Sequence, residues 1–93
     1  MIVSFKCKQT EELWVTGKCK RFPPEALKAA LRKLLMVHSA TELKDLRIPP
    51  SNHLENLLGD RKEQYSIRIN QKWRLCFVWK NKKAHEVEIV DYH

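Results

Sequence analysis

Residues 65–80 read YSIRINQKWRLCFVWK, and they decide the fold because apolar and polar residues alternate on both sides of a short polar connection. The apolar positions are Tyr65, Ile67 and Ile69 before the connection and Trp73, Leu75, Phe77 and Trp79 after it. Alternation of this kind is typical of β-strands that bury one face. The stretch therefore predicts a β-hairpin that turns at residues 70–72.

The length of this turn fixes which residues lie opposite each other. A three-residue turn pairs Ile67 with Leu75. It also pairs Arg68 with Arg74, so the apolar and basic residues keep to separate faces. A two-residue turn would mix the faces, which the pleat disfavours at every position. Like charges directly opposite each other destabilise a sheet, so this pair suggests an anion between them; the alternative is two arginines that point into solvent or pair with local Glu.

Most of the positive charge surrounds this hairpin. The 93 residues have a formal net charge of +7, and residues 59–83 supply +6 of it, eight Lys or Arg minus two acids. The candidate phosphate-binding residues in this block are Arg61, Arg68, Lys72 and Lys80. Clustered charge attracts a polyanion and favours nucleic acid or the ribosome as a partner. The alternative is a solvated basic face with no partner.

Upstream, the sequence predicts a strand and two helices. Residues 1–6 alternate weakly and predict an N-terminal strand. Thr10 is expected to cap a short helix that ends at Gly17, and residues 21–25 (RFPPE) are expected to begin the main helix. In the main helix the expected apolar stripe is Leu27, Ala30, Leu31, Leu34 and Leu35, and the expected outward residues are Lys28, Arg32 and Lys33. Together with a last strand at 85–92, this indicates a single α+β domain over residues 1–93.

Several classes of protein are disfavoured by composition. No apolar run is long enough for a membrane span, and the N-terminus lacks the features of a secretory signal. Three cysteines without CxxC spacing argue against a disulfide framework or a structural zinc site. The four histidines are scattered, and two glycines cannot form a phosphate-cradling loop. We therefore expect a cytoplasmic protein with no metal and no other cofactor.

The remaining chemistry is that of RNA cleavage without metal. A base takes the proton of the 2′-OH, cations stabilise the phosphorane, and an acid protonates the leaving 5′-oxygen. Arg74 with Arg68 or Arg61 could hold phosphate, because a planar guanidinium fork binds two oxygens at once. His93, with Tyr92, could transfer a proton. Alternatively, a terminal histidine is simply part of the surface.

The chain resembles the HigB family, the branch of the RelE/ParE superfamily of toxins that includes the GraT-like toxins of type II toxin–antitoxin systems. The matching pieces are MIVSF (1–5), ATELKDLRIPPSNHLENLLGDR (40–61), SIRINQKWRLCFVW (66–79) and VEIVDYH (87–93). The resemblance implies a RelE-like α+β fold, in which an N-terminal strand and two helices pack on a curved, mostly antiparallel sheet. It also implies a bacterial, ribosome-dependent mRNA endonuclease that cleaves in the A site without metal.

The resemblance further assigns partners and roles. It implies neutralisation by a HigA-type helix-turn-helix antitoxin, contact with the 70S ribosome and mRNA, and operator DNA binding only through the antitoxin complex. Arg74 would stabilise the phosphorane and His93 would transfer a proton. Asp91 would orient His93, and Tyr92 would stack on a base or hydrogen-bond the phosphate.

The chain departs from the family upstream of the Gly-Asp pair. A common HigB pattern has His and Lys there, as in HPLKGD, whereas this stretch reads LENLLGD, with Glu55 and Leu58 in their place. Glu55 is therefore a candidate base, and His53, two residues earlier, is the alternative. If neither group suffices, the protein would be a ribosome- or RNA-binding growth inhibitor without efficient cleavage. A DNA-binding module is disfavoured because no helix-turn-helix pattern is present.

Overall fold

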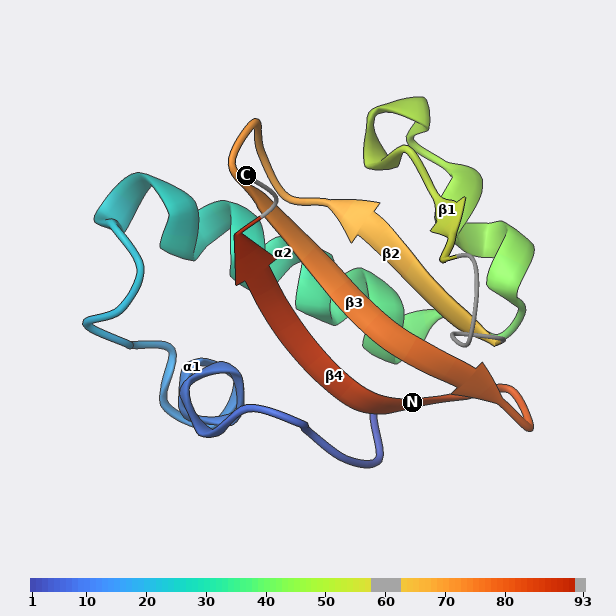
Figure 1. Ribbon diagram of the computed structural model, residues 1–93, viewed down its shortest axis with the longest axis horizontal. Helices are drawn as coiled ribbons and strands as arrows, with labels where there is room; N and C mark the ends of the chain where they lie inside the picture. Colours follow the sequence, from blue (N-terminus) through green and yellow to red (C-terminus); the bar gives the residue numbers. More distant parts are fainter. Residues whose placement is uncertain (58–62, 92–93) are drawn as a thin grey trace.

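The computed structural model describes residues 1–57 and 63–91, shown in Figure 1. The helical elements are α1 (Lys8–Thr16), α2 (Pro24–Ser39) and the 3₁₀ turns η1 (Leu43–Arg47) and η2 (Pro50–Asn52). The strands are β1 (Glu55–Asn56), β2 (Gln64–Arg68), β3 (Trp73–Lys80) and β4 (Lys83–Asp91). They form one antiparallel sheet in the order β1-β2-β3-β4. The predicted α+β class, with helices on a mostly antiparallel sheet, is confirmed.

The register of the central hairpin is the predicted one. Ile67 lies opposite Leu75, and Arg68 lies opposite Arg74. The side-chain oxygen of Asn70 accepts hydrogen bonds of 2.9 Å from the backbone N–H groups of Lys72, in the turn, and Trp73, the first residue of β3. Asparagine favours turns because its side chain can satisfy the local backbone in this way. The three-residue turn thus separates an apolar face from a basic one.

The two faces of the sheet have different environments. Ile67, Leu75 and Ile89 are fully buried on one face, in the core formed with α1 and α2. In Figure 1, α2 passes behind the sheet and α1 lies beside β4. In the described part of the chain, no α-helix covers the face turned towards the viewer. We call this second face, which carries Arg68 and Arg74, the open face. Within residues 1–57 and 63–91, no helix is long and apolar enough to cross a membrane.

The N-terminal segment is extended, but it is not a continuous strand. Residues 1–6 run parallel to β4 and form two isolated bridges, Ile2 with Ala84 and Phe5 with Val87. Backbone hydrogen bonds of 2.9–3.1 Å connect the two segments. The predicted strand is therefore present only as an interrupted one, and it covers the outer edge of β4, where unpaired backbone groups would invite association with another chain.

The expected role of Thr10 is wrong. Cys7 is the residue that precedes the first turn of α1, so Thr10 lies inside the helix. Its side chain is fully buried, and its Oγ1 accepts a hydrogen bond of 3.0 Å from the backbone N–H of Ile89. Thr10 therefore connects α1 to β4 rather than capping the helix. Gly17 ends α1 as expected, with a left-handed φ of 77°.

The outward orientation expected for Lys33 is also wrong. α2 begins at Pro24 after Pro23, in agreement with the sequence, but its buried face includes Lys33 beside Leu34. Leu35, expected in the stripe, is 56% exposed. Burial of an ammonium requires a hydrogen-bond acceptor, and the Oδ1 of the fully buried Asn52 accepts a hydrogen bond from Lys33.

Candidate functional site

Arg74 is the centre of the basic site, and it is buried rather than outward-pointing. The residue is 6% exposed although it lies on the open face. Its Nε donates a hydrogen bond of 3.0 Å to Ser66 Oγ, and its Nη2 donates one of 2.6 Å to the backbone oxygen of His53. Glu55 Oε1 lies 3.8 Å from the same Nη2. These contacts fix the orientation of the guanidinium before any ligand arrives.

The segment between η2 and β1 provides these contacts. His53 follows η2 in the left-handed region, with φ 45° and ψ 58°, a conformation that is uncommon for residues other than glycine. Glu55 then enters β1 opposite Ser66. The hydrogen bond from Arg74 to the His53 carbonyl stabilises this turn, since strained backbone persists only where the surroundings hold it.

A hollow of about 230 Å³ opens beside the guanidinium. Its lining includes Arg74, Glu55, Arg68 and His53. The structure thus brings together two predicted arginines and both candidates for the upstream base. Arg68 is partly exposed, and its Nε donates to the Asn70 backbone oxygen at 3.2 Å. Two guanidinium groups and one carboxylate around an open hollow could bind phosphate and accept a proton beside it.

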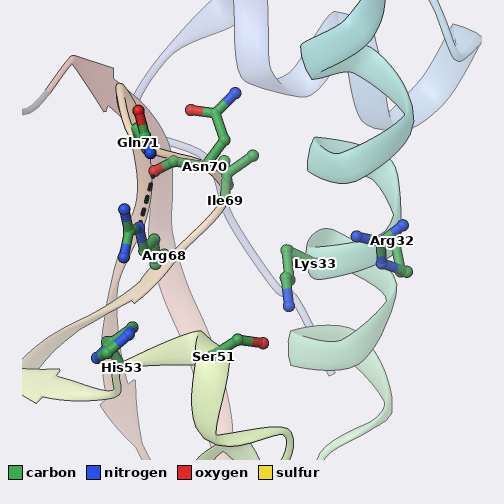
Figure 2. A pocket seen from close by; sticks show the side chains of 8 residues that line it. All are labelled: Arg32, Lys33, Ser51, His53, Arg68, Ile69, Asn70 and Gln71. Atoms are coloured by element: carbon green, nitrogen blue, oxygen red, sulfur yellow. Dashed lines mark hydrogen bonds between the residues drawn. The ribbon is translucent and has the colours of Figure 1, made fainter.

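A second hollow, of about 310 Å³, continues from the first one. Its lining is Arg32, Lys33, Ser51, His53, Arg68, Ile69, Asn70 and Gln71. Figure 2 shows it between α2, which carries Arg32 and Lys33, and the turn after β2, with His53 and Ser51 at its lower end. The two hollows share His53 and Arg68, so we describe them together as the groove.

The geometry of the sheet explains the course of the groove. β1 has two residues, which pair only with Ser66 and Tyr65. The last residues of β2, including Arg68, therefore extend beyond the end of β1. The groove passes round this end of β2 from the open face towards α2.

Lys33 lines the groove with a largely buried ammonium. Its pKa is lowered from the ordinary value of 10.5, first by burial of the ammonium and then by the neighbouring Arg32 guanidinium. Lys33 was not predicted as a site residue, although one sequence signal existed. It falls at the buried spacing of Ala26, Ala30 and Val37, where an apolar residue is expected.

Two other predicted residues form a separate pair at the end of the sheet. Lys72 Nζ lies 3.8 Å from Asp91 Oδ2, and both side chains are exposed. Asp91 lies opposite Trp73, whereas Arg74 lies opposite Val90. Neighbouring residues of a strand point to opposite faces, so the Asp91 side chain leaves the sheet on the other face from Arg74.

The remaining predicted residues are not placed in the groove. Lys80 ends β3 opposite Lys83, six residues from Arg74, or about 20 Å along an extended strand. Arg61, Tyr92 and His93 lie outside the described residues. Among residues 1–57 and 63–91, no group of three His, Cys, Asp or Glu side chains is arranged to hold a metal ion.

Comparisons with known proteins agree on one family. Residues 3–93 match the model of the family described as RelE-like toxin of type II toxin–antitoxin system HigB. Toxin HigB-1 of Vibrio cholerae serotype O1 is 41% identical over 80 residues, which cover 85% of this chain and 84% of that protein. Endoribonuclease HigB of Proteus vulgaris is 31% identical over 93 residues, the full length of both proteins.

A solved structure supports the fold independently. The crystal structure of YafQ from E. coli strain BL21(DE3) aligns with a TM-score of 0.57 and covers 99% of this chain and 94% of its own. Its sequence identity is 13%, so it is similar in fold alone.

Proposed function

Because the chain belongs to the HigB family of RelE-like toxins from type II toxin–antitoxin systems, we propose that it is an endoribonuclease that cleaves mRNA in the ribosomal A site and so inhibits translation. The observation that carries this proposal is the fixed Arg74 guanidinium, which lines a hollow together with Arg68 and Glu55. The full-length similarity to a protein named Endoribonuclease HigB supports the same activity.

The reaction is a transesterification that needs no metal. The 2′-oxygen of a nucleotide loses its proton and bonds to the adjacent phosphorus. The bond from phosphorus to the 5′-oxygen then breaks, and this oxygen leaves with a proton. Arg74 and Arg68 would stabilise the extra negative charge of the phosphorane, because hydrogen bonds already orient their guanidinium groups on the wall of the hollow.

Proton transfer requires a base and an acid. Glu55 is the proposed base because its carboxylate lies beside Arg74, 3.8 Å from Nη2, on the wall of the hollow. His53 lines the same hollow and is the alternative. His93 is the proposed acid, and Tyr92 and Asp91 are proposed to orient it or to contact the RNA, on the strength of the family motif.

The proposed partners follow from the family. A type II toxin acts beside an antitoxin. We propose a HigA-type helix-turn-helix antitoxin, with operator DNA bound only through the complex, and a cytoplasmic site of action on 70S ribosomes and mRNA. The candidate phosphate contacts Lys72 and Lys80 would then serve the ribosome rather than the groove, since Lys72 is exposed just before β3 and Lys80 is exposed at its end. Arg61 is also a proposed phosphate contact.

The experiment is controlled expression in a bacterial host, with growth and message integrity followed together. Expression of the wild-type chain should arrest growth and fragment mRNA. Arg74→Ala and deletion of His93 should each restore growth while the protein remains folded. If both variants remain fully toxic, these residues do not form the active site.

Growth arrest with intact messages would support a different function. The protein would then be a ribosome- or RNA-binding inhibitor without efficient cleavage. The observation that favours this alternative is the upstream departure, where Glu55 stands in place of the family's histidine.

A further inference from the structure

The α2 half of the groove carries two positive charges, those of Arg32 and Lys33, that the proposed cleavage step does not use. Together with Arg68, which also lines the Arg74 hollow, they line the 310 Å³ hollow, and among residues 1–57 and 63–91 no carboxylate does so. Three cations around one concave surface repel one another and favour an anionic ligand. The Arg74 half is different, because Glu55 offsets one of its two guanidinium charges.

Lys33 is held in the wall of this hollow rather than extended into solvent. The residue is 4% exposed, and its ammonium donates a hydrogen bond to Asn52 Oδ1. Asn52 is fixed in turn, because its Nδ2 donates to the backbone oxygens of Leu46 at 3.1 Å and Ile48 at 3.4 Å. Lysine normally keeps its charged end in water. Here the ammonium is positioned by the fold before a ligand binds.

The structure shows no oppositely charged partner for Lys33 in the part of the chain that it describes. A buried ammonium without a counter-ion is costly, and this cost is reflected in its lowered pKa. An anion in the hollow would offset the cost, so the site fits a negatively charged group.

The groove connects this site to the proposed cleavage centre. His53, Arg68, Asn70 and Gln71 line both hollows, so a ligand could pass from Arg74 to Lys33 along one wall. Figure 2 shows Arg68 and His53 on one side of the hollow and Lys33 on the other. A nucleic acid strand carries a phosphate at every nucleotide, so a strand cleaved beside Arg74 would bring another phosphate into this space.

We propose that Lys33 and Arg32 form a second phosphate subsite, which binds a backbone phosphate of the RNA next to the one that is cleaved. Arg68 lines both hollows and lies between this subsite and the cleavage centre. This subsite rests on the proposed function for the identity of its ligand. It positions the strand and takes no part in bond breaking. The side-chain amides of Asn70 and Gln71 line the same space and can hydrogen-bond a ribose or a base edge.

An acidic protein segment is a less suitable occupant. A bound protein segment usually places an apolar or aromatic anchor in a pocket. Among residues 1–57 and 63–91, the only large apolar side chain that lines this hollow is Ile69, which is 7% exposed. The lining is otherwise polar or cationic, which fits a sugar–phosphate backbone better.

The test measures binding of an RNA hexanucleotide made uncleavable by 2′-O-methylation, by fluorescence anisotropy over a range of salt concentrations. The variants are Arg32→Gln, which is exposed and should fold normally, and Lys33→Gln, which keeps a donor for Asn52. Lys28→Gln is the matched control, because Lys28 is exposed one turn earlier on α2 and outside the lining of the groove. Thermal unfolding verifies that each variant is folded.

Arg32→Gln and Lys33→Gln should each raise Kd roughly fivefold at low salt and reduce the slope of log Kd against log salt by about 0.7, the value for one lost phosphate contact on a single strand. Lys28→Gln should leave both quantities unchanged. Equal RNA binding by all folded variants overturns the proposal. The proposal is also overturned if the substitutions at Arg32 and Lys33 weaken binding of the antitoxin but leave RNA binding unchanged.

A cleavage assay on programmed ribosomes separates this subsite from the proposed activity. If the wild-type protein cleaves and Arg32→Gln raises KM with kcat unchanged, both proposals are supported. If the wild-type protein does not cleave but the hexanucleotide still requires Arg32 and Lys33, the subsite stands and the nuclease proposal fails. Normal cleavage with no effect of either substitution on KM or Kd overturns the subsite alone.

Discussion

Replacement of Arg74 by lysine should separate the charge of this residue from its geometry. The guanidinium makes two short directional hydrogen bonds at once, from Nε to Ser66 Oγ and from Nη2 to the His53 oxygen, and a longer one of 3.4 Å from Nη2 to the Ser66 backbone oxygen. A lysine ammonium is a point charge without this planar fork, so we expect it to keep only one of the two short bonds. One buried acceptor would then lose a charged donor.

The size of the expected effect follows from that lost bond. A hydrogen bond to a charged group contributes about 2 kcal/mol to the free energy of unfolding. For a domain of this length, such a loss corresponds to a decrease in Tm of about 10 °C. Loss of one preorganised donor to the phosphorane should reduce the cleavage rate by about 10² or more.

Urea unfolding measures the loss of stability. Single-turnover cleavage on programmed ribosomes, at a temperature where the variant is folded, measures the loss of cleavage rate. Ser66→Ala is the matched control, because it removes the acceptor of Nε but leaves the guanidinium in place. It should also lose about 2 kcal/mol of stability, because the lost bond is again one to the guanidinium, but the cleavage rate should fall less than about tenfold. A rate for Arg74→Lys within about threefold of wild type would refute the proposed role of the guanidinium fork.

Three further predictions concern the fold and the proton-transfer groups. Thr10→Val should reduce the free energy of unfolding by about 1–3 kcal/mol, because it leaves the buried N–H of Ile89 without an acceptor, whereas Thr10→Ser should lose less in the same urea titration. Hydrogen bonds from the backbone N–H groups of Glu42 and Thr41 lower the pKa of the Asp45 carboxyl below its ordinary 3.8. The carboxylate therefore stabilises the fold fully above pH 3.8, and this stabilisation is lost as the pH falls through the lowered pKa. Asp45→Asn should remove this part of the dependence of Tm on acidic pH, and an unchanged profile of Tm against pH would contradict the prediction. If Glu55 is the base, Glu55→Gln should reduce the cleavage rate far more than His53→Gln, and the reverse order would assign the role to His53.

The central hairpin was predictable because its register depends on local pattern. Two alternating runs and a three-residue turn determine that Arg68 lies opposite Arg74, and the structure has this register. The same reasoning could not show that Arg74 is buried. Its burial depends on His53 and Glu55, which come from a segment about twenty residues earlier in the chain.

Lys33 illustrates the same limit in a helix. From the sequence alone, a lysine on a helix is expected to point into solvent. The acceptor that makes the burial of Lys33 possible is Asn52, which lies in a turn far along the chain. The predicted cap at Thr10 was wrong for a related reason. The helix begins before Thr10, and the hydroxyl of Thr10 has its partner in the last strand. The groove is therefore formed by contacts between segments far apart in the sequence. Local sequence patterns could predict only the side of the groove that the β2–β3 hairpin forms.

The most direct test of the proposed activity is primer-extension mapping of an mRNA that is incubated with purified wild-type protein and chelator, with and without ribosomes. We expect cuts inside the codon that occupies the A site, only when ribosomes are present, and none with Arg74→Ala. An intact message on programmed ribosomes, under conditions where the folded toxin arrests translation, would contradict the proposed nuclease activity.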